Sequence, residues 1–202
     1  MNTSLGSSMF VTDWRGLRQL VVGLMLFGCG MGLVVRGGNG QGPWTVFHEG
    51  LSDRSPLSIG GATVVTGVLL LVIVLAMGVR VGLGTVLNVI IIGPTTDLTL
   101  WLLDEPGSAV TRVVFTILAP LVVGLGSALY LGVHVGPGPR DGVMTGLAVR
   151  GWSIRTARFS IEAFAFFGGL ILGGTIGWGT AWWLIAIGPA VQTSLPWFDR
   201  SP

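Results

Sequence analysis

The chain has 202 residues, of which 50% are hydrophobic and only 10% are charged, and its mean hydropathy is +0.79. A soluble globular domain carries about 25% charged residues, so this composition indicates an integral membrane protein. The net charge is only +2, and the basic residues, all arginines, are scattered between apolar runs, which argues against a nucleic-acid partner. The single cysteine, Cys29, excludes an intrachain disulfide and is predicted to be a buried helix residue without a reactive role.

The N-terminal region is predicted to consist of a tail over residues 1–15 followed by a first membrane span. Arg15 and Arg18 precede the apolar stretch from Leu20 to Val35, a pattern typical of a signal peptide. The same segment recurs internally from Thr116 to Leu131, where no signal peptide can lie. We therefore expect the first apolar segment to be a retained span.

Six segments have the roughly 20 mainly apolar residues that a bilayer crossing needs. They are Leu17–Val35, Ile59–Val79, Leu83–Leu103, Val113–Val135, Arg158–Ile176 and Thr180–Trp197. Two shorter segments, Pro43–Leu51 and Pro139–Val149, follow the first and the fourth span, and they are too short to cross. The sequence therefore predicts an all-α membrane fold of six transmembrane helices and two short half-helices.

The two halves of the chain repeat one pattern. Gly82-Leu83-Gly84-Thr85 recurs 95 positions later as Gly177-Trp178-Gly179-Thr180, and Gly93-Pro94 recurs as Gly188-Pro189 at the same shift. Gly42-Pro43 recurs 96 positions later as Gly138-Pro139. Such a fixed register is typical of a tandem duplication. We divide one membrane domain into a first repeat over residues 16–105 and a second over 106–198.

Three spans in each repeat, an odd number, would insert the second repeat upside down relative to the first. With the N-terminus in the cytoplasm, the inner side holds eight arginines and the outer side holds Arg36, Arg54 and Arg112. Because positive loops stay on the cytoplasmic side, we expect both termini to be cytoplasmic. The expected location is the bacterial cytoplasmic (inner) membrane.

The Gly-Pro pairs of the third and the sixth span are predicted to kink or break these helices, because proline removes a backbone donor. Paired interruptions in inverted halves are typical of a binding site at the bilayer midplane. Polar residues follow each predicted break, and the candidate ligand-binding residues here are Thr96 and Asp97 in one half and Gln192, the equivalent of Asp97, in the other. The alternative is that Gly93-Pro94 and Gly188-Pro189 only shape helices in a packed bundle.

The two short segments begin with Gly-Pro, a favoured helix start because proline at the first position wastes no donor. If both dip into the membrane from opposite sides, their positive ends would meet near its centre and suit a small anionic ligand. Their candidate binding residues are Trp44, Thr45 and His48 in the first segment and Arg140 and Asp141 in the second. The alternative is that both short helices lie in the membrane interface, with arginines facing headgroups.

Two further polar residues lie within predicted spans. Glu162 is the one carboxylate deep in the fifth span, and Arg158 lies four residues earlier on the same face. The alternatives are therefore a ligand-binding Glu162 and a structural Arg158–Glu162 pair. Asn88 in the third span is a second candidate, and it could equally hydrogen-bond a neighbouring helix.

The chain lacks a Ser-His-Asp arrangement, a phosphate-binding loop and paired carboxylates at catalytic spacing, so nothing favours an enzyme. No cofactor is expected. Only two histidines occur, without ligand spacing, and no metal site is expected either.

The chain resembles the YczE/YyaS/YitT group of bacterial membrane proteins. The resembling motifs are Gly42–Leu51, Gly82–Asn88, Gly136–Leu147, Ser153-Ile154-Arg155 and Gly177-Trp178-Gly179-Thr180 through Gly188-Pro189. The resemblance implies a protein of the bacterial cytoplasmic membrane, and the group has no agreed substrate.

The function that these features favour is a small transporter or channel-like protein with its ligand site at the repeat interface. The alternative is a non-transporting membrane scaffold or regulatory subunit that binds a partner protein. The expected partners are the lipid bilayer, a small anionic ligand, and either further copies of the chain or another membrane protein.

Overall fold

The computed structural model describes residues 13–200, and residues 1–12 and 201–202 lie outside the described part. Residues 13–200 form eight α-helices and no strand. In chain order these are α1 (Trp14–Gly37), α2 (Pro43–Asp53), α3 (Ile59–Ala76), α4 (Leu83–Leu102), α5 (Ala109–Leu131), α6 (Pro139–Val149), α7 (Ile154–Leu172) and α8 (Trp178–Phe198). Most of the predicted tail lies outside the described residues, and its end already belongs to α1, which Asp13 caps.

Four of these helices, α1, α3, α4 and α5, are long and apolar enough to cross a membrane. The predicted fifth and sixth spans correspond to α7 and α8, which are not among the four. The first half of α7 carries Arg155, Arg158 and Glu162, and the last third of α8 contains the polar run Gln192-Thr193-Ser194. Membrane crossings by α7 and α8 therefore remain a prediction.

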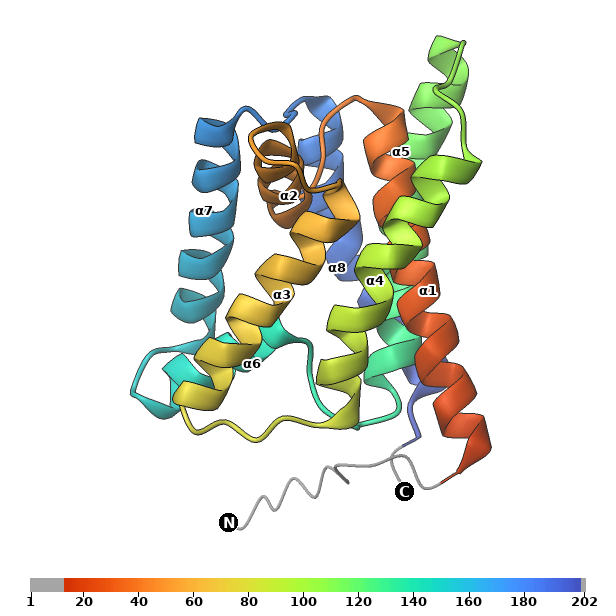
Figure 1. Cartoon of the computed structure of the whole chain (residues 1–202). Coiled ribbons are helices and arrows are strands. Elements are labelled where there is room, and N and C mark those ends of the chain that lie inside the picture. The colour runs from red at the N-terminus through yellow and green to blue at the C-terminus, as the bar shows by residue number, and fades with distance from the viewer. Residues whose placement is uncertain (1–12, 201–202) are drawn as a thin grey trace.

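The order of long and short helices is the same in both halves of the chain. The two short helices, α2 and α6, each have 11 residues and begin at Pro43 and Pro139. Figure 1 shows α1, α4 and α7 running upward, whereas α3, α5 and α8 run downward. Each long helix of the first half therefore runs opposite to its equivalent in the second half.

The helix starts follow from local sequence. Ser58, Ser108 and Ser153 precede α3, α5 and α7, and each side chain accepts a hydrogen bond from the backbone N–H three residues later. Such N-caps satisfy one of the free donors of a first helical turn. The short helices α2 and α6 have no such cap, and proline occupies their first turn after a glycine.

The predicted helix breaks at Gly93-Pro94 and Gly188-Pro189 are not found, because both helices are continuous there, and a kink at these positions stays a prediction. α4 continues through Pro94, and α8 continues through Pro189 and Pro196. A proline removes only one helical hydrogen bond, and membrane helices tolerate this loss where neighbouring groups satisfy the freed carbonyl.

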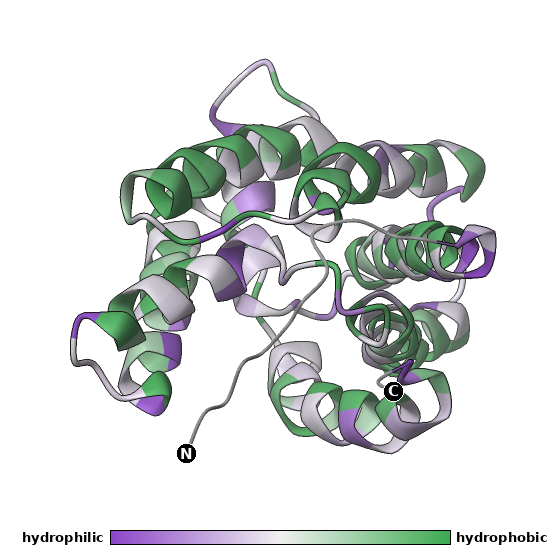
Figure 2. Ribbon diagram, turned by 90° about the horizontal axis from the view of Figure 1, so that it is seen from below, coloured by the Kyte–Doolittle hydropathy of each residue, from purple (hydrophilic) through white to green (hydrophobic). Residues whose placement is uncertain are grey.

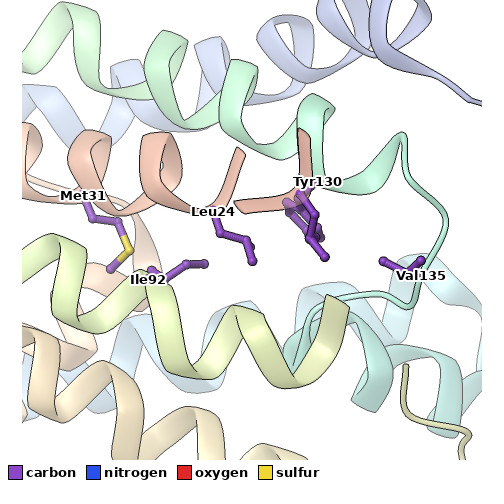
Figure 3. Packing of buried hydrophobic residues seen from close by; sticks show 6 residues of the cluster. Leu24, Met31, Ile92, Tyr130 and Val135 are labelled. Carbon is purple, nitrogen blue, oxygen red and sulfur yellow. The ribbon is translucent and has the colours of Figure 1, made fainter. Parts of the chain in front are cut away.

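The core lies where α1 meets α4 and α5 (Figure 3). Its buried residues are Leu20, Leu24, Met31, Ile92, Tyr130 and Val135. Glycines bring the backbones of α1 and α5 close together, since a Cβ on Gly126 would lie 2.6 Å from the Gly23 carbonyl oxygen. Small residues at a helix interface allow this close approach in membrane proteins.

Seen from below, the long helices are mostly hydrophobic and the hydrophilic stretches are short (Figure 2). Many large apolar side chains point away from the protein, among them Leu69 and Val72 on α3 and Phe164 and Ile171 on α7. Exposed apolar surface on this scale is expected where a helix faces lipid.

The equivalent glycines Gly93 and Gly188 should respond differently to alanine. A Cβ on Gly93 would lie 2.5 Å from the Gly60 carbonyl oxygen, whereas a Cβ on Gly188 would meet nothing within 4 Å. We expect Gly93→Ala to lower the free energy of unfolding by about 1–3 kcal/mol through overpacking. Gly188→Ala should be neutral or stabilising by up to about 1 kcal/mol, because alanine favours the helix. Thermal unfolding of both variants in the same detergent makes this comparison, and equal losses would contradict it.

Candidate functional site

A cavity of about 380 Å³ lies at the centre of the helices, and residues of all eight helices line it. The first turns of both short helices reach this cavity. Gly42-Pro43-Trp44-Thr45 lines it from α2, and Gly138-Pro139-Arg140-Asp141 lines it from α6. Because the first N–H groups of a helix lack helical partners, both short helices direct the positive ends of their dipoles into the cavity.

Equivalent positions of the two halves face the cavity in pairs. These pairs include Trp44 with Arg140, Thr45 with Asp141, Thr63 with Arg158, Gly67 with Glu162, and Asn88 with Trp183. The cavity therefore lies between the two halves, and most of its pairs combine different side chains. The positions that line the cavity are equivalent in the two halves, whereas the side chains at these positions differ.

Most residues predicted to bind a ligand line this one cavity. They are Trp44, Thr45, His48, Asn88, Arg140, Asp141, Glu162 and Gln192. Gly188 lines it as well, whereas Gly93, Pro94 and Pro189 do not.

Thr96 and Asp97 lie elsewhere and have structural contacts. Thr96 is fully buried and donates to the Gly28 and Ile92 carbonyl oxygens at 3.2 and 2.9 Å. Asp97 accepts hydrogen bonds from Ser58 Oγ at 2.6 Å and from the Gly60 N–H at 2.8 Å. The Asp97 carboxylate therefore satisfies the start of α3.

His48 presents an unpartnered ring nitrogen in this site. Its side chain is 5% exposed, and Nδ1 lies 3.1 Å from Thr63 Oγ1. The Thr63 hydroxyl donates its one proton to the Ile59 carbonyl oxygen at 2.9 Å, so it can only accept from His48. The Nδ1 atom therefore carries the proton, and Nε2, buried without a partner among the described residues, is an acceptor.

The electrostatics favour this neutral form of His48. Burial, and then the charge of Arg140, hold the pKa of His48 well below its usual value. Because the imidazole stays neutral, its Nε2 lone pair is available to a donor on a ligand or a water.

Trp44 supplies the complementary group one turn earlier on α2. Its Nε1–H is buried and has no hydrogen-bond partner within residues 13–200. The Trp44 and His48 rings lie 6.2 Å apart, centroid to centroid. One face of α2 thus offers a donor, Trp44 Nε1–H, and an acceptor, His48 Nε2. Because leaving a buried polar group unsatisfied costs about 1–3 kcal/mol, a bound ligand or water that pairs with them would be favourable.

The charged residues of the cavity form two ion pairs, and only one of them is close enough to be hydrogen-bonded. Arg158 Nε donates to Glu162 Oε1 at 3.1 Å, as predicted for the structural alternative, although both residues also line the cavity. Arg140 Nε lies 3.9 Å from Asp141 Oδ1, which is too far for a hydrogen bond. The Arg140 guanidinium is therefore the cation with free donors at the first turn of α6.

The sequence patterns missed several lining residues, notably Thr63 and Thr66 on α3, Tyr130 on α5 and Trp183 on α8. Aligning the repeats could have found Trp183, because it is the equivalent of the predicted Asn88. Thr63 and Thr66 lie three residues apart in an otherwise apolar helix, a spacing that places two hydroxyls on one face. Within residues 13–200, no group of three His, Cys, Asp or Glu side chains could hold a metal ion.

Known proteins are similar in sequence to this chain over most of its length. The model of a family of unknown function, DUF6198, matches residues 15–196. An uncharacterised protein of Haemophilus influenzae is 34% identical over 197 residues, which cover 97% of this chain and 90% of that protein. The uncharacterised membrane protein YczE of Bacillus subtilis is 28% identical over 177 residues, which cover 86% of this chain and 82% of that protein.

No solved structure matches the chain. The resemblance to the YczE group is confirmed, and the helices of the described chain agree with a place in the membrane. The chain is a membrane protein and belongs to the DUF6198 family of unknown function.

Proposed function

We propose that this protein is a small membrane transporter or channel-like protein whose ligand site is the central cavity. The observation that carries the proposal is the pair of unpartnered buried groups, His48 Nε2 and Trp44 Nε1, beside the first turns of both short helices. Most buried polar groups in a packed core are hydrogen-bonded, so two unpartnered groups that line one cavity favour a ligand or water there. A ligand that both accepts and donates hydrogen bonds, and carries negative charge for Arg140, would satisfy all of them.

The proposed architecture has six crossing helices arranged as two inverted repeats. The opposite directions of α1 and α5, of α3 and α7, and of α4 and α8 in Figure 1 support it. The pairing of equivalent residues around the cavity supports it too. In inverted-repeat transporters the substrate lies near the midplane, at the repeat interface, where helix N-termini meet anionic groups.

In this arrangement α7 and α8 cross the membrane although they carry polar residues. Arg158 and Glu162 pair with each other, and Gln192 lines the cavity. Polar side chains in membrane segments are tolerated when they pair or face a cavity inside the protein. The short helices α2 and α6 enter from opposite sides and end at the cavity.

The alternative, a scaffold or regulatory subunit, is favoured by the close glycine packing of α1 against α5. That packing fills one side of the repeat interface, whereas the cavity, lined by apolar side chains and a few polar groups, lies beside it. A scaffold has no need for a central cavity that receives Arg140 and the unpartnered groups of Trp44 and His48, so the cavity favours the ligand-binding proposal.

The topology leads to a first prediction about the two sides of the membrane. The start of α1 and the end of α8 lie at the same side of the molecule, where Arg200 Nη1 lies 3.0 Å from Asp13 Oδ1. Reporter fusions at Pro202 and in the loop Asp104–Gly107 should report opposite sides of the membrane, with Pro202 in the cytoplasm. Finding both reporters on one side would rule out the inverted arrangement.

The ligand site leads to a second prediction. Small anions such as phosphate, sulfate and acetate should be screened by thermal unfolding of the purified protein, and at least one should raise the midpoint. Arg140→Ala should weaken that apparent affinity by about tenfold or more, because a hydrogen bond to a charged group contributes about 1.5–3 kcal/mol. The variant should insert into the membrane and purify normally, because Arg140 has only a loose contact with Asp141.

Two matched variants separate binding from stability. Arg54→Ala removes the same charge from the exposed end of α2 and should leave the anion effect unchanged. Glu162→Gln should lower stability slightly, by a few tenths of a kcal/mol for an exposed i,i+4 pair, and keep the anion effect. Full anion-induced stabilisation of Arg140→Ala would refute the proposed site.

A further inference from the structure

The two halves of the protein differ in how their last two long helices meet. In the first half α3 packs along α4, and Gly60 on α3 lies directly against the backbone of Gly93 on α4. Asp97 of α4 also holds the first turn of α3 through the Ser58 hydroxyl and the Gly60 N–H. The α3–α4 side of the cavity is therefore closed.

The equivalent helices α7 and α8 hardly touch. The position of Gly60 is occupied by Arg155, and that of Asp97 by Gln192. A Cβ added to Gly188, the equivalent of Gly93, would meet nothing within 4 Å. α7 packs instead on α2 and α6, and it stands apart at the edge of the molecule in Figure 1.

The cavity reaches the surface at this gap. Three of its lining residues, Arg158, Leu184 and Gln192, are exposed, and all three belong to α7 or α8. The other lining residues are buried or half-buried. Beside the gap, large apolar side chains such as Phe159 and Ile185 point outward, with exposed fractions of 72% and 68%.

The sides of this opening are apolar, whereas its inner end is charged and polar. In the proposed six-helix arrangement the outward face of α7 and α8 meets the hydrocarbon of the bilayer. The cavity volume of about 380 Å³ lies near the lower end of the roughly 300–1,000 Å³ of ligand pockets. It can hold a polar head, and a long apolar chain would remain in the gap between α7 and α8.

We propose that the gap between α7 and α8 is a lateral portal, through which an anionic amphiphile enters from the bilayer and places its charged head in the cavity. Two cations lie on the first two turns of α7, beside this opening. Arg155 at the start of α7 is exposed and makes no hydrogen bond or ion pair among residues 13–200, and Arg158 is 59% exposed at the cavity mouth. Inside, Arg140 and the first turns of α2 and α6 receive the head. The inference rests on the proposed ligand site and adds the route and the chemical class.

The test uses the full chain in phosphatidylcholine nanodiscs, with dodecyl phosphate as the amphiphile. Inorganic phosphate is the matched head without a chain, and dodecyl maltoside is the matched chain without a charge. Dodecyl phosphate should raise the unfolding midpoint with at least tenfold higher apparent affinity than inorganic phosphate. Dodecyl maltoside should not raise it.

Blocking the portal should remove this difference. Gly188→Phe places a ring in the open space beside Gly188 and should reduce the apparent affinity for dodecyl phosphate at least tenfold. Val72→Phe, on the outward face of α3, is the control of the same final size and should change nothing. If Gly188→Phe does not fold, Leu184→Trp at the same opening replaces it.

The outcomes separate the two proposals. If Arg140→Ala abolishes dodecyl phosphate binding and the portal variants do not affect it, the portal is overturned and the cavity site stands. If Arg140→Ala binds as the wild type does, the cavity site itself is refuted. If inorganic phosphate binds as tightly as dodecyl phosphate, the apolar chain contributes nothing, and the proposal of an amphiphilic ligand is overturned. If dodecyl maltoside raises the unfolding midpoint as much as dodecyl phosphate does, the proposal of a charged head is overturned.

Discussion

The length of the two short helices is the constraint on which the rest of the structure depends. An 11-residue helix spans about 16 Å, roughly half of the 30 Å of a bilayer core. Lipid offers no hydrogen bonds to the free N–H groups at the start of such a helix. α2 packs on α3 and α7, α6 packs on α3, α4 and α7, and both first turns open into a cavity that residues of all eight helices line. In this account the ligand site results from a backbone that cannot be satisfied by lipid.

In the proposed architecture, a duplication accounts for the shape of the cavity, and substitutions since that duplication account for its chemistry. Trp44 and Arg140 occupy equivalent positions, as do Gly67 and Glu162. The largest difference is in packing, because a glycine at position 60 lets α3 approach α4, whereas its equivalent is Arg155 and α7 stands apart from α8. One half of a symmetric fold thus closes the cavity and the other half leaves it open. In the proposed inverted arrangement the two halves form matching walls, and the divergence of their sequences decides which wall admits the proposed ligand.

Much of the fold was predictable because the Gly-Pro motifs repeat at a fixed shift, and both short helices begin where the motif places them. The approach of Arg140 and His48 to one cavity also followed from treating the short helices as a facing pair, whereas Glu162 was predicted separately, as the carboxylate deep in the fifth span. The position of Asp97 outside the cavity did not follow from the sequence, because its role depends on α3 lying beside α4, which no local pattern encodes. No break interrupts α4 or α8 at the Gly-Pro pairs, since neighbouring groups can support a helix through a single lost hydrogen bond. The open side of the cavity could not be predicted either, because it requires knowing that α7 rests on α2.

An experimental structure of the protein in lipid nanodiscs is the measurement that tests the central claim most directly. The account predicts a polar cavity between the first turns of α2 and α6, with His48 Nε2 and Trp44 Nε1 bonded to a ligand or to water rather than to protein. It also predicts that α7 stands away from α8, with lipid or ligand density in the gap. A structure in which α7 packs along α8 and protein side chains fill the space between the two short helices would contradict it.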